Sequence, residues 1–482
     1  MLIGEPLPFV SAFVDELDVA LKTHGENARG LSTLQRRWLG FCLMAIMVTN
    51  SVCWARFERV GLGGYSRGAL SWMFRHAKLP WERLLEKSVE VILRRHGIVS
   101  GTLVLDDTDK RRSKLTQRIA GVHKLKDKAS GGFLMGQSVV FLLLVSATLT
   151  VPVGFAFYEP DPVRRAWDKR ERELKQQGIP KRQRPPEPAR NPAYPTKPEL
   201  GLRLLERFGQ WHPSITVKAV LADALYGTAA FVNRAGAIFG GVQVISQLRS
   251  NQNVRFRHRS LTLEQYFARY PGVHQRYRRR GDKSIDVSVS SARLYLQAHG
   301  QKRFVIALKY EGESEYRYLV ASDLSWRTED IVQTFTLRWL VEVFIQDWKG
   351  HEGWGALTKQ PGQDGSSHGL ILSLLVDHCL LLHPAQLAQM KHCQPAFTVG
   401  SLINHIKVDS LLAVLRTILT AADPAHQFQQ LSDALAEGFR LQFSEKHMVG
   451  RDLGRMEPSP SLKYRAIDPP QQSSPYRQAE KT

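Results

Sequence analysis

The sequence predicts an α/β protein, and three features of the chain support this prediction. Residues 1 to about 100 space their apolar residues as helices do, for example in LSTLQRRWLGFCLMAIMV and WERLLEKSVEVILRRHG. From Gly101 onward, short apolar runs rich in β-branched residues indicate strands, and two of these runs end in acidic residues. A helical pattern returns after about residue 326. We therefore expect a mixed sheet flanked by helices.

The net charge of the chain indicates which kind of binding partner to expect. The chain has 482 residues and a formal net charge of +21, with a pI near 9.9. Such an excess of Lys and Arg favours a polyanionic partner, with nucleic acid first and an anionic membrane surface second. Because 43% of the residues are hydrophobic, the chain can bury a substantial core and is not a disordered basic tail. A basic protein without any polyanionic partner remains the alternative.

The cysteines and apolar segments favour a cytosolic protein that has no membrane partner. Cys42, Cys53, Cys379 and Cys393 form no CxxC pair, and we expect reduced, buried thiols. The first residues, MLIGEPLPFV, show no signal-peptide pattern. Residues 133–157 are apolar enough to suggest a membrane span, but Gln, Pro and Gly residues interrupt them and β-branched residues are frequent. Two buried, adjacent strands explain this segment better.

The later elements follow in order along the chain. A Pro-rich segment full of Arg and Lys occupies residues 159–198, and we expect an exposed loop there. Leu200–Gly209 is a predicted helix, and SITVKAVLAD is a strand that ends in an acid. Residues 240–325 alternate as strands do and include the basic stretch QRYRRRGDK. A helix starting near Thr328 and a buried helix, SSHGLILSLLVDHCLLLH, complete this part.

One predicted helix, TLRWLVEVFIQDWKG, carries three charged residues on a narrow arc. At about 100° per residue, Glu342 lies near 40° and Lys349 near 20° from Arg338. The adjacent arc is apolar and would face a core. A solvated charged stripe with an ordinary Arg–Glu helix pair is the alternative interpretation.

Acidic residues stand at the ends of two predicted strands. In LVLDDTD, alternation places Asp107 on the face of Leu103 and Leu105, and Asp106 on the opposite face. In VKAVLAD, Asp223 ends the strand on the face of Val217, Ala219 and Leu221. A carboxylate at the end of a buried strand is costly unless it is paired or binds a metal. Together with Glu342, these acids would form an all-oxygen site for Mg²⁺ or Mn²⁺, although each Asp alone could be a turn or cap residue.

The order of these features resembles a known family. Strand-Asp, two strands, strand-Asp, a β-rich insertion and helix-Glu are similar to the RNase H-like core of DDE transposases from bacterial insertion sequences. The resemblance is to insertion sequence family four, the group with a Tyr-Arg-Glu-Lys signature, and covers about residues 100–380. LDDT, LADALYG and FTLRWLVEVFIQDWKG carry it. In that signature Arg precedes Glu by four residues and Lys follows it by seven, as here. Phe335 stands where the signature has Tyr, so the phenol hydroxyl that contacts DNA phosphate in the family is missing.

The resemblance implies a role for each site residue. Asp107 (directly before Thr108), Asp223 and Glu342 would be the catalytic residues and the ligands of two Mg²⁺ or Mn²⁺ ions. Arg338 and Lys349 would hold DNA phosphates, and Phe335 would lie at the DNA. Tyr318 is our candidate for stacking on a flipped base. Arg249, which follows the strand VISQL, is a further candidate for phosphate contact.

The resemblance also implies a reaction and its partners. The enzyme would bind the inverted-repeat ends of its element as a homodimer, nick the double-stranded DNA, form and open hairpin ends, and join them to target DNA in the bacterial cytoplasm, close to the nucleoid. A domesticated or inactive DNA-binding homologue and an RNase H-like DNA nuclease are the alternatives. The expected division of the chain is a helical domain for DNA-end binding (1–100), the catalytic core (101–235 and 326–385), an inserted β-domain (236–325), a C-terminal helical region for dimer or DNA contacts (386–450) and a disordered tail (451–482).

Overall fold

The computed structural model describes residues 3–23, 29–112, 119–127, 130–278, 284–356, 362–392 and 394–441. The chain forms two compact units, Met1–Ala421 and Ala422–Thr482. The first unit contains the sheet and every predicted site residue, and the second contains helix α15 (Pro424–Gly438). Cys393, part of QRYRRRGDK, the end of the predicted C-terminal helical region and the predicted disordered tail lie outside the described residues.

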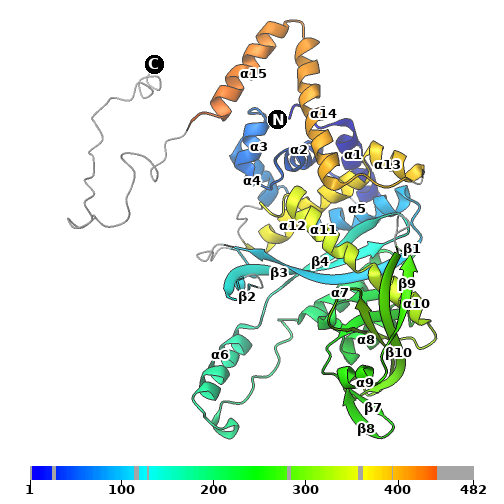
Figure 1. The fold of residues 1–482 in the computed structure, drawn as a ribbon. Coiled ribbons are helices and arrows are strands. Elements are labelled where there is room, and N and C mark those ends of the chain that lie inside the picture. Colours follow the sequence, from blue (N-terminus) through cyan, green and yellow to red (C-terminus); the bar gives the residue numbers. More distant parts are fainter. Residues whose placement is uncertain are drawn as a thin grey trace, which may run out of the picture. The chain divides into compact units, whose positions relative to one another are not determined.

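In the first unit a group of helices precedes the strands, and further helices lie between and after the strands (Figure 1). Its helices are α1 (Pro8–Lys22), α2 (Thr33–Thr49), α3 (Trp54–Val60), α4 (Arg67–His76), α5 (Trp81–Arg95), α6 (Pro162–Gln176), η1 (Lys181–Gln183), α7 (Lys197–Trp211), η2 (Ala224–Tyr226), α8 (Ala229–Ile238), α9 (Leu263–Arg269), η3 (Gln297–His299), α10 (Thr328–Thr336), α11 (Trp339–His351), α12 (Gly362–Leu381), α13 (Pro384–Lys391) and α14 (Val399–Leu419). Its strands are β1 (Ser100–Arg111), β2 (His123–Lys126), β3 (Phe133–Val145), β4 (Thr150–Tyr158), β5 (Thr216–Ala222), β6 (Gln243–Leu248), β7 (Asn253–Phe256), β8 (Arg259–Thr262), β9 (Val273–Arg278), β10 (Ser284–Leu296), β11 (Gln301–Tyr310) and β12 (Arg317–Ala321).

The strands form one mixed sheet, which confirms the predicted fold class. Its order is β2-β3-β1-β5-β6-β12-β11-β10-β7-β8, with β4 paired to β3 and β9 to β10. At the centre, β1 pairs antiparallel with β3 and parallel with β5, and β5 pairs parallel with β6. Parallel neighbours place their carboxyl ends at the same edge of a sheet. The two strands that carry the acids are therefore side by side, with the acids at one edge of their parallel pairing. β1 does not end at its acids as predicted but continues to Arg111.

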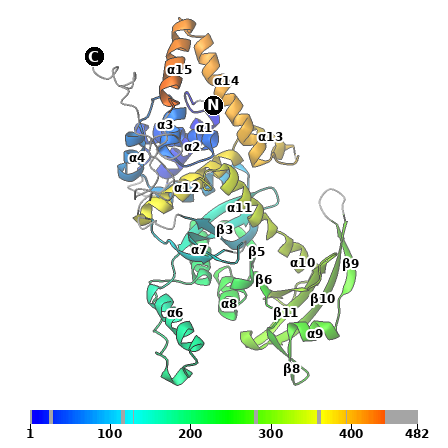
Figure 2. The same ribbon diagram turned by 60° about the vertical axis from the view of Figure 1, so that its left-hand side comes forward.

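Helices cover both faces of the central strands (Figures 1 and 2). Val104 and Leu221 belong to a large core that also contains Trp348 of α11 and residues of α2 and α12. Leu103 belongs to a second core with Leu204 of α7 and residues of α8. Successive residues of β1 thus point to different helical layers, as strand alternation requires.

A bulge in β5 makes one prediction wrong, that Val217 and Leu221 lie on the same face of the strand. Gly101 pairs with Val217 but Thr102 pairs with Ala219, so one residue of β5 has no partner in β1. A bulge of one residue reverses the side to which the preceding side chains point. Val217 accordingly packs in the second core, whereas Leu221 packs in the first, and the two do not share a face as predicted.

The strands after β6 extend the central sheet. β12 pairs antiparallel with β6, and β11 and β10 follow outward. We predicted an inserted β-domain from residue 236, but β6 still pairs with β5, so the added strands begin only after Leu248. Helix α9 packs on these strands in a third core, a helix that the alternating pattern did not predict.

The basic Pro-rich segment is a folded element that contains a helix, which corrects the predicted loop. Asp161 caps α6 by accepting a hydrogen bond from Val163 N at 2.8 Å, and Pro162 suits the first helical turn. The predicted strands within 133–157 are present as β3 and β4. No single helix in the described part is long and apolar enough to cross a membrane, although two bent helix pairs meet that test by length and composition.

The described cysteines form no disulfide. Cys42 and Cys379 are buried and Cys53 is half-buried. Burial raises the pKa of the Cys42 and Cys379 thiols well above the usual range, which keeps both protonated and unreactive.

Candidate active site

Three aspartates meet at the carboxyl edge of the central parallel strands. Asp106 and Asp107 lie near the middle of β1, and Asp223 directly follows β5, because Leu105 of β1 pairs with Ala222 of β5. One carboxylate oxygen from each aspartate lies within 4.8 Å of the others. The structure therefore brings together two of the predicted catalytic acids, Asp107 and Asp223, and adds Asp106.

Local hydrogen bonds fix Asp223 in place. Its carboxylate accepts a hydrogen bond from Leu225 N at 2.8 Å and caps η2. Ser246 on β6 donates to the Asp223 carbonyl oxygen at 2.6 Å. Burial raises the pKa of Asp223 in spite of the Leu225 hydrogen bond, and the nearby Asp107 raises it further.

The two adjacent aspartates of β1 have different cationic partners. Asp106 points to the α11 side and accepts a hydrogen bond from Arg338 Nη1 at 2.9 Å. Asp107 forms an ion pair with Lys197, the first residue of α7. Burial, with a smaller contribution from Asp223, raises the pKa of Asp106 to about 6. Asp106 therefore belongs to the site as much as Asp107 does. The sequence resemblance had assigned the catalytic role to Asp107 and not to Asp106.

Glu342 joins the cluster through Arg338. The predicted continuous helix breaks near Leu337 into α10 and α11, and Arg338 is the residue that precedes α11. Its Nη2 donates to Glu342 Oε1 at 2.5 Å while Nη1 contacts Asp106. The predicted common arc of Arg338 and Glu342 is therefore present. Within the described residues, Glu342 is not among the three acids that lie within 4.8 Å, and its side chain is 40% exposed.

Lys349 lies on the same side of the site. Its Nζ donates to Thr108 Oγ1 at 2.5 Å and to the Asp109 carbonyl at 3.2 Å. Two further cations lie nearby, Lys110 on β1 and Arg112 directly after it: burial lowers the pKa of Lys110 to about 8 and that of Arg112 to about 10. Lys349 and Arg112 also repel the Lys110 ammonium. The end of β1 therefore carries partly desolvated positive charge, the property of a surface that receives phosphates.

Sequence reasoning missed several of these side chains. The run DDTDKRR carried a signal for Lys110 and Arg112, because cations directly follow the acids on one strand. Lys197 gave no signal, since 90 residues separate it from Asp107. Tyr226, in LADALYG, is fully buried, and its hydroxyl finds no hydrogen-bond partner in the described part of the chain. Burial and the three aspartates raise its pKa, so the hydroxyl stays protonated beside them.

Three predicted DNA contacts lie apart from the carboxylates. Phe335 is buried in the first core, with the Arg338 guanidinium 6.0 Å from its ring centroid, a position suited to packing. Tyr318 is 5% exposed in the third core, 5.8 Å between ring centroids from Phe267, so its ring is not open to a flipped base. Arg249 is exposed at the end of β6, where a phosphate could reach it.

The donor set suits a hard divalent cation. Among the described residues, the cationic side chains that pair with the four carboxylates are Arg338 and Lys197, so the cluster keeps an excess of negative charge. Burial is the main cause of the raised pKa values of Asp106 and Asp223, and the neighbouring aspartates raise both pKa values further. Oxygen ligands of this kind suit Mg²⁺ or Mn²⁺, and within the described part of the chain the cluster contains no thiol or imidazole.

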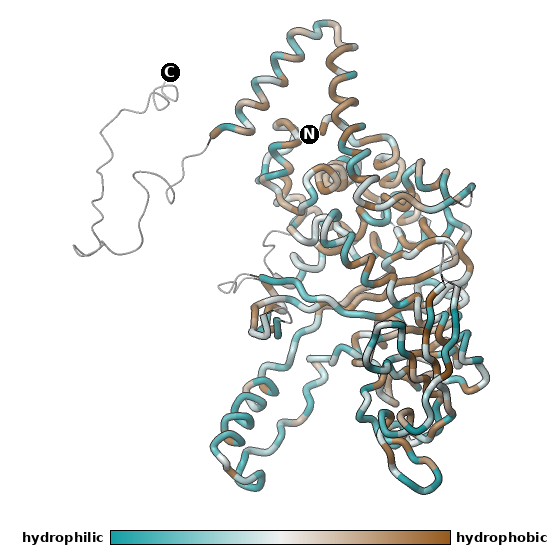
Figure 3. The backbone as a smooth tube through the Cα atoms, in the orientation of Figure 1, coloured by the Kyte–Doolittle hydropathy of each residue, from teal (hydrophilic) through white to brown (hydrophobic). Residues whose placement is uncertain are grey.

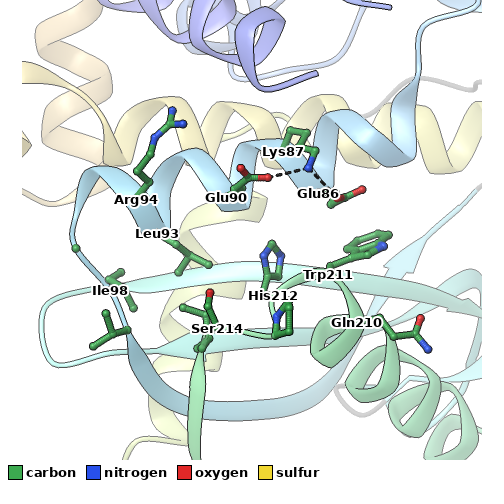
Figure 4. Close-up of a pocket in the computed structure, with 14 residues that line it drawn as sticks. Glu86, Lys87, Glu90, Leu93, Arg94, Ile98, Gln210, Trp211, His212 and Ser214 are labelled. Atoms are coloured by element: carbon green, nitrogen blue, oxygen red, sulfur yellow. Dashed lines mark hydrogen bonds and ion pairs between the residues drawn. The ribbon is translucent and has the colours of Figure 1, made fainter. Parts of the chain in front are cut away.

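A pocket of about 600 Å³ lies at the opposite ends of β1 and β5 (Figure 4). Lys87 extends between Glu90 at 2.8 Å and Glu86 at 3.1 Å. Burial lowers the pKa of His212 to about 4, and its Nε2 has no partner among the described residues. This pocket is separate from the carboxylates, which lie at the other edge of the sheet.

Comparisons with known proteins add a family and a structural neighbour. The family described as DDE superfamily endonuclease matches residues 33–306, a span that contains the three aspartates but ends before Glu342. A solved piggyBac transposase, in a synaptic complex with hairpin DNA, superposes with a TM-score of 0.42 at 9% identity over 89% of this chain and 82% of that chain. Comparison with curated proteins gives no match.

Proposed function

Since the chain belongs to the DDE superfamily endonucleases, we propose that it is the transposase of a bacterial insertion sequence of family four. It binds the terminal inverted repeats of its element, cleaves DNA in a metal-dependent reaction and joins the ends to target DNA by cut-and-paste through hairpin ends. One observation carries this proposal: Asp106, Asp107 and Asp223 meet at the edge of neighbouring parallel strands, with Arg338 linking Glu342 to them.

The proposed cofactor is a pair of Mg²⁺ or Mn²⁺ ions. The aspartates and Glu342 are the residues that would hold them. Such ions, when bound, activate a water or a 3′-hydroxyl and neutralise charge on the leaving oxygen. Arg338 and Lys197 neutralise the carboxylates until then, and each must give up a carboxylate that becomes a ligand.

The chain's own contribution is to position the DNA backbone. Arg338 lies between two carboxylates, and Lys349 lies beside Lys110 and the strand end. A phosphate held by Lys349 would lie next to the carboxylate edge. Fixing the scissile phosphate there supplies orientation and stabilises the developing charge, which are the main protein contributions to phosphoryl transfer.

The inserted strands are the feature that supports hairpin formation. They lie between β6 and α10, so they extend the sheet away from the strands that carry the aspartates and end at the helices that carry Arg338 and Glu342. A nuclease that only hydrolyses DNA does not need such a module. With Tyr318 buried, the residue that would stack on a flipped base is left unassigned.

An apolar stripe on α14 supports the proposed homodimer. Its exposed members recur at helical spacing and are Val408, Leu411, Leu412, Leu415 and Leu419, each at least 36% exposed. A stripe with this period is self-complementary and suits the same helix of a second copy. Two copies are also what the joining of two DNA ends requires.

Cleavage of a supercoiled plasmid that carries the element and its flanks tests the proposed function. Reactions contain Mg²⁺ or EDTA, with the wild type and the variants Asp107→Asn, Asp223→Asn and Glu342→Gln. Excised DNA with hairpin ends, lost in EDTA and in each variant, is the expected result. Linear products without hairpins would point to the nuclease alternative, and salt-sensitive binding without cleavage would point to an inactive DNA-binding homologue.

A further inference from the structure

The segment between β4 and α7, residues 159–196, forms a folded arm. α6 runs outward and the chain returns along it: Trp167 Nε1 donates to the Pro185 carbonyl at 3.0 Å. Arg184 pairs with Glu171 at 2.7 Å and donates to the Ile179 carbonyl at 2.7 Å. These contacts hold the returning segment against α6. Figures 1 and 2 show the arm projecting from the central domain, and Figure 3 shows it as one of the most hydrophilic parts of the chain.

The two faces of α6 differ in how they are used. One face of α6 is half-buried against the returning chain. Its residues recur every three or four positions and are Arg164, Trp167, Asp168, Glu171 and Leu174. The opposite face is exposed and carries Arg165, Lys169, Arg172 and Gln176, which recur every three or four residues. Arg165, Lys169 and Arg172 are hereafter called the outer basic row.

The acids of the arm leave two members of the outer basic row, Arg165 and Arg172, without an ion-pair partner among the described residues. Asp168 and Glu187 pair with Arg164, and Glu171 pairs with Arg184. The closest approach of an acid to the row is Glu173 to Lys169, at 3.9 Å. Among the described residues, the arm cations that join no ion pair are Arg165, Arg170, Arg172, Lys175, Lys181 and Arg182. The arm is thus an exposed surface with unbalanced positive charge.

The two ends of the arm meet beside the carboxylate cluster. β4 ends at Tyr158, and the Lys197 ammonium that begins α7 lies 5.5 Å from the Tyr158 ring centroid. The same ammonium is the ion-pair partner of Asp107. The arm therefore leaves the domain at the site where a scissile phosphate would lie.

We propose that the outer basic row grips the sugar-phosphate backbone of the DNA duplex that continues beyond the cleavage site. This inference rests on the proposed function, because it takes the substrate to be double-stranded DNA. A helix of this length spans roughly 22 Å, the rise of about six or seven base pairs, so the contacts fall within about one turn of the cleaved bond. The row offers cations without a shape for reading bases, so the grip is independent of sequence.

A triple variant, Arg165→Gln with Lys169→Gln and Arg172→Gln, tests the proposal in the full-length protein. The substitutions lie on the exposed face and leave the packing of Trp167 and the Arg184 contacts intact. The matched control removes the same charge from the β7–β8 hairpin, at the exposed residues Arg255, Arg257 and Arg259. Unchanged thermal midpoints for both variants establish that the fold is retained.

Binding to a duplex that contains one element end and its flank is measured in EDTA over a range of salt concentrations, with hydroxyl-radical footprinting. We expect the triple variant to lose protection next to the cleavage site and to reduce the salt slope of log affinity by about 3, whereas the control keeps that protection. Protection and slope like those of the wild type would overturn the proposal. Cleavage of the same DNA by the wild type in Mg²⁺ is measured separately. Protection of the flank without cleavage would support this inference and contradict the proposed function.

Discussion

The guanidinium of Arg338 donates a hydrogen bond to the carboxylate of Asp106 at 2.9 Å, and neither side chain is more than 16% exposed. These residues lie 232 positions apart, directly before α11 and on β1. Their contact shows which of the two adjacent aspartates faces the helix that carries Glu342. It also gives the site a counter-charge that a metal ion would have to replace.

Asp106→Asn is expected to lower DNA cleavage in Mg²⁺ by more than about a hundredfold, as Asp107→Asn does. The reason is that Asp106 shares the cluster with Asp223, and loss of a direct metal ligand exceeds the 10- to 100-fold effect of losing an outer partner. The rate of plasmid cleavage measures this effect. If Asp106→Asn cleaves DNA at the wild-type rate, Asp107 is the only one of the two adjacent aspartates that acts as a metal ligand.

Lys197→Ala is expected to lower the free energy of unfolding without metal by about 1–2 kcal/mol, because Asp107 loses a charged hydrogen-bond partner inside an acidic cluster. Mg²⁺ should then raise the thermal midpoint more in the variant than in the wild type, since the ion no longer competes with an ammonium. Lys197→Arg, which keeps the charge, is the control. Equal Mg²⁺ shifts in all three proteins would contradict a role for Lys197 as a stand-in cation.

Lys349→Ala is expected to slow DNA cleavage about ten- to hundredfold, with a smaller effect on binding, because its ammonium lies at Thr108 beside the carboxylates. Single-turnover cleavage and binding are measured side by side. Lys391→Ala, which removes an exposed cation at the end of α13, is the control for charge. An equal loss in both variants would show a general electrostatic effect and not a local one.

Variants of Tyr318 distinguish a packing role for its ring from a role in base stacking. Tyr318→Ala is expected to reduce the free energy of unfolding by about 3 kcal/mol, because the ring is buried against Phe267. Tyr318→Phe should cleave DNA at the wild-type rate. Thermal unfolding and hairpin yield distinguish the roles: a stable Tyr318→Ala protein that fails only in hairpin formation would restore the stacking role.

A buried pair of acids predicts that stability falls as pH rises. Glu352 is fully buried and faces Asp377, and neither has an ion-pair partner among the described residues. Burial raises the pKa of Glu352, and raises that of Asp377 to about 7. Each acid is protonated more readily when folded than when unfolded, so the stabilisation from each is complete below its unfolded pKa of about 4. The contribution of Asp377 is lost as pH rises through about 7, and that of Glu352 is lost as pH rises through its own raised pKa.

Glu352→Gln should therefore flatten the decline of the thermal midpoint between about pH 5 and pH 8. The change removes one of the two titrating groups and the repulsion between them. Glu264→Gln, at an exposed position on α9, is the matched control and should decline like the wild type. A Glu352→Gln profile parallel to that of the wild type would show that the pair does not titrate in this range.

The sequence by itself determined the local features of this protein. The α/β class, the strands β3 and β4 and the acid that follows β5 agree with the periodicity, which depends only on neighbours in the chain, whereas β1 continues past its acids to Arg111. The spacing of Arg338 and Glu342 on one helical arc follows in the same way, and their hydrogen bond is present. The charge of the arm is also evident in its composition.

Only the tertiary structure decided which side chains meet. A bulge in β5 reversed one predicted face, and α10 and α11 separated at Leu337 where one helix was expected. Lys197 reached Asp107 across 90 residues, and the third core buried Tyr318. Register, bulges and burial arise from contacts between distant segments, and no local period of the sequence encodes them.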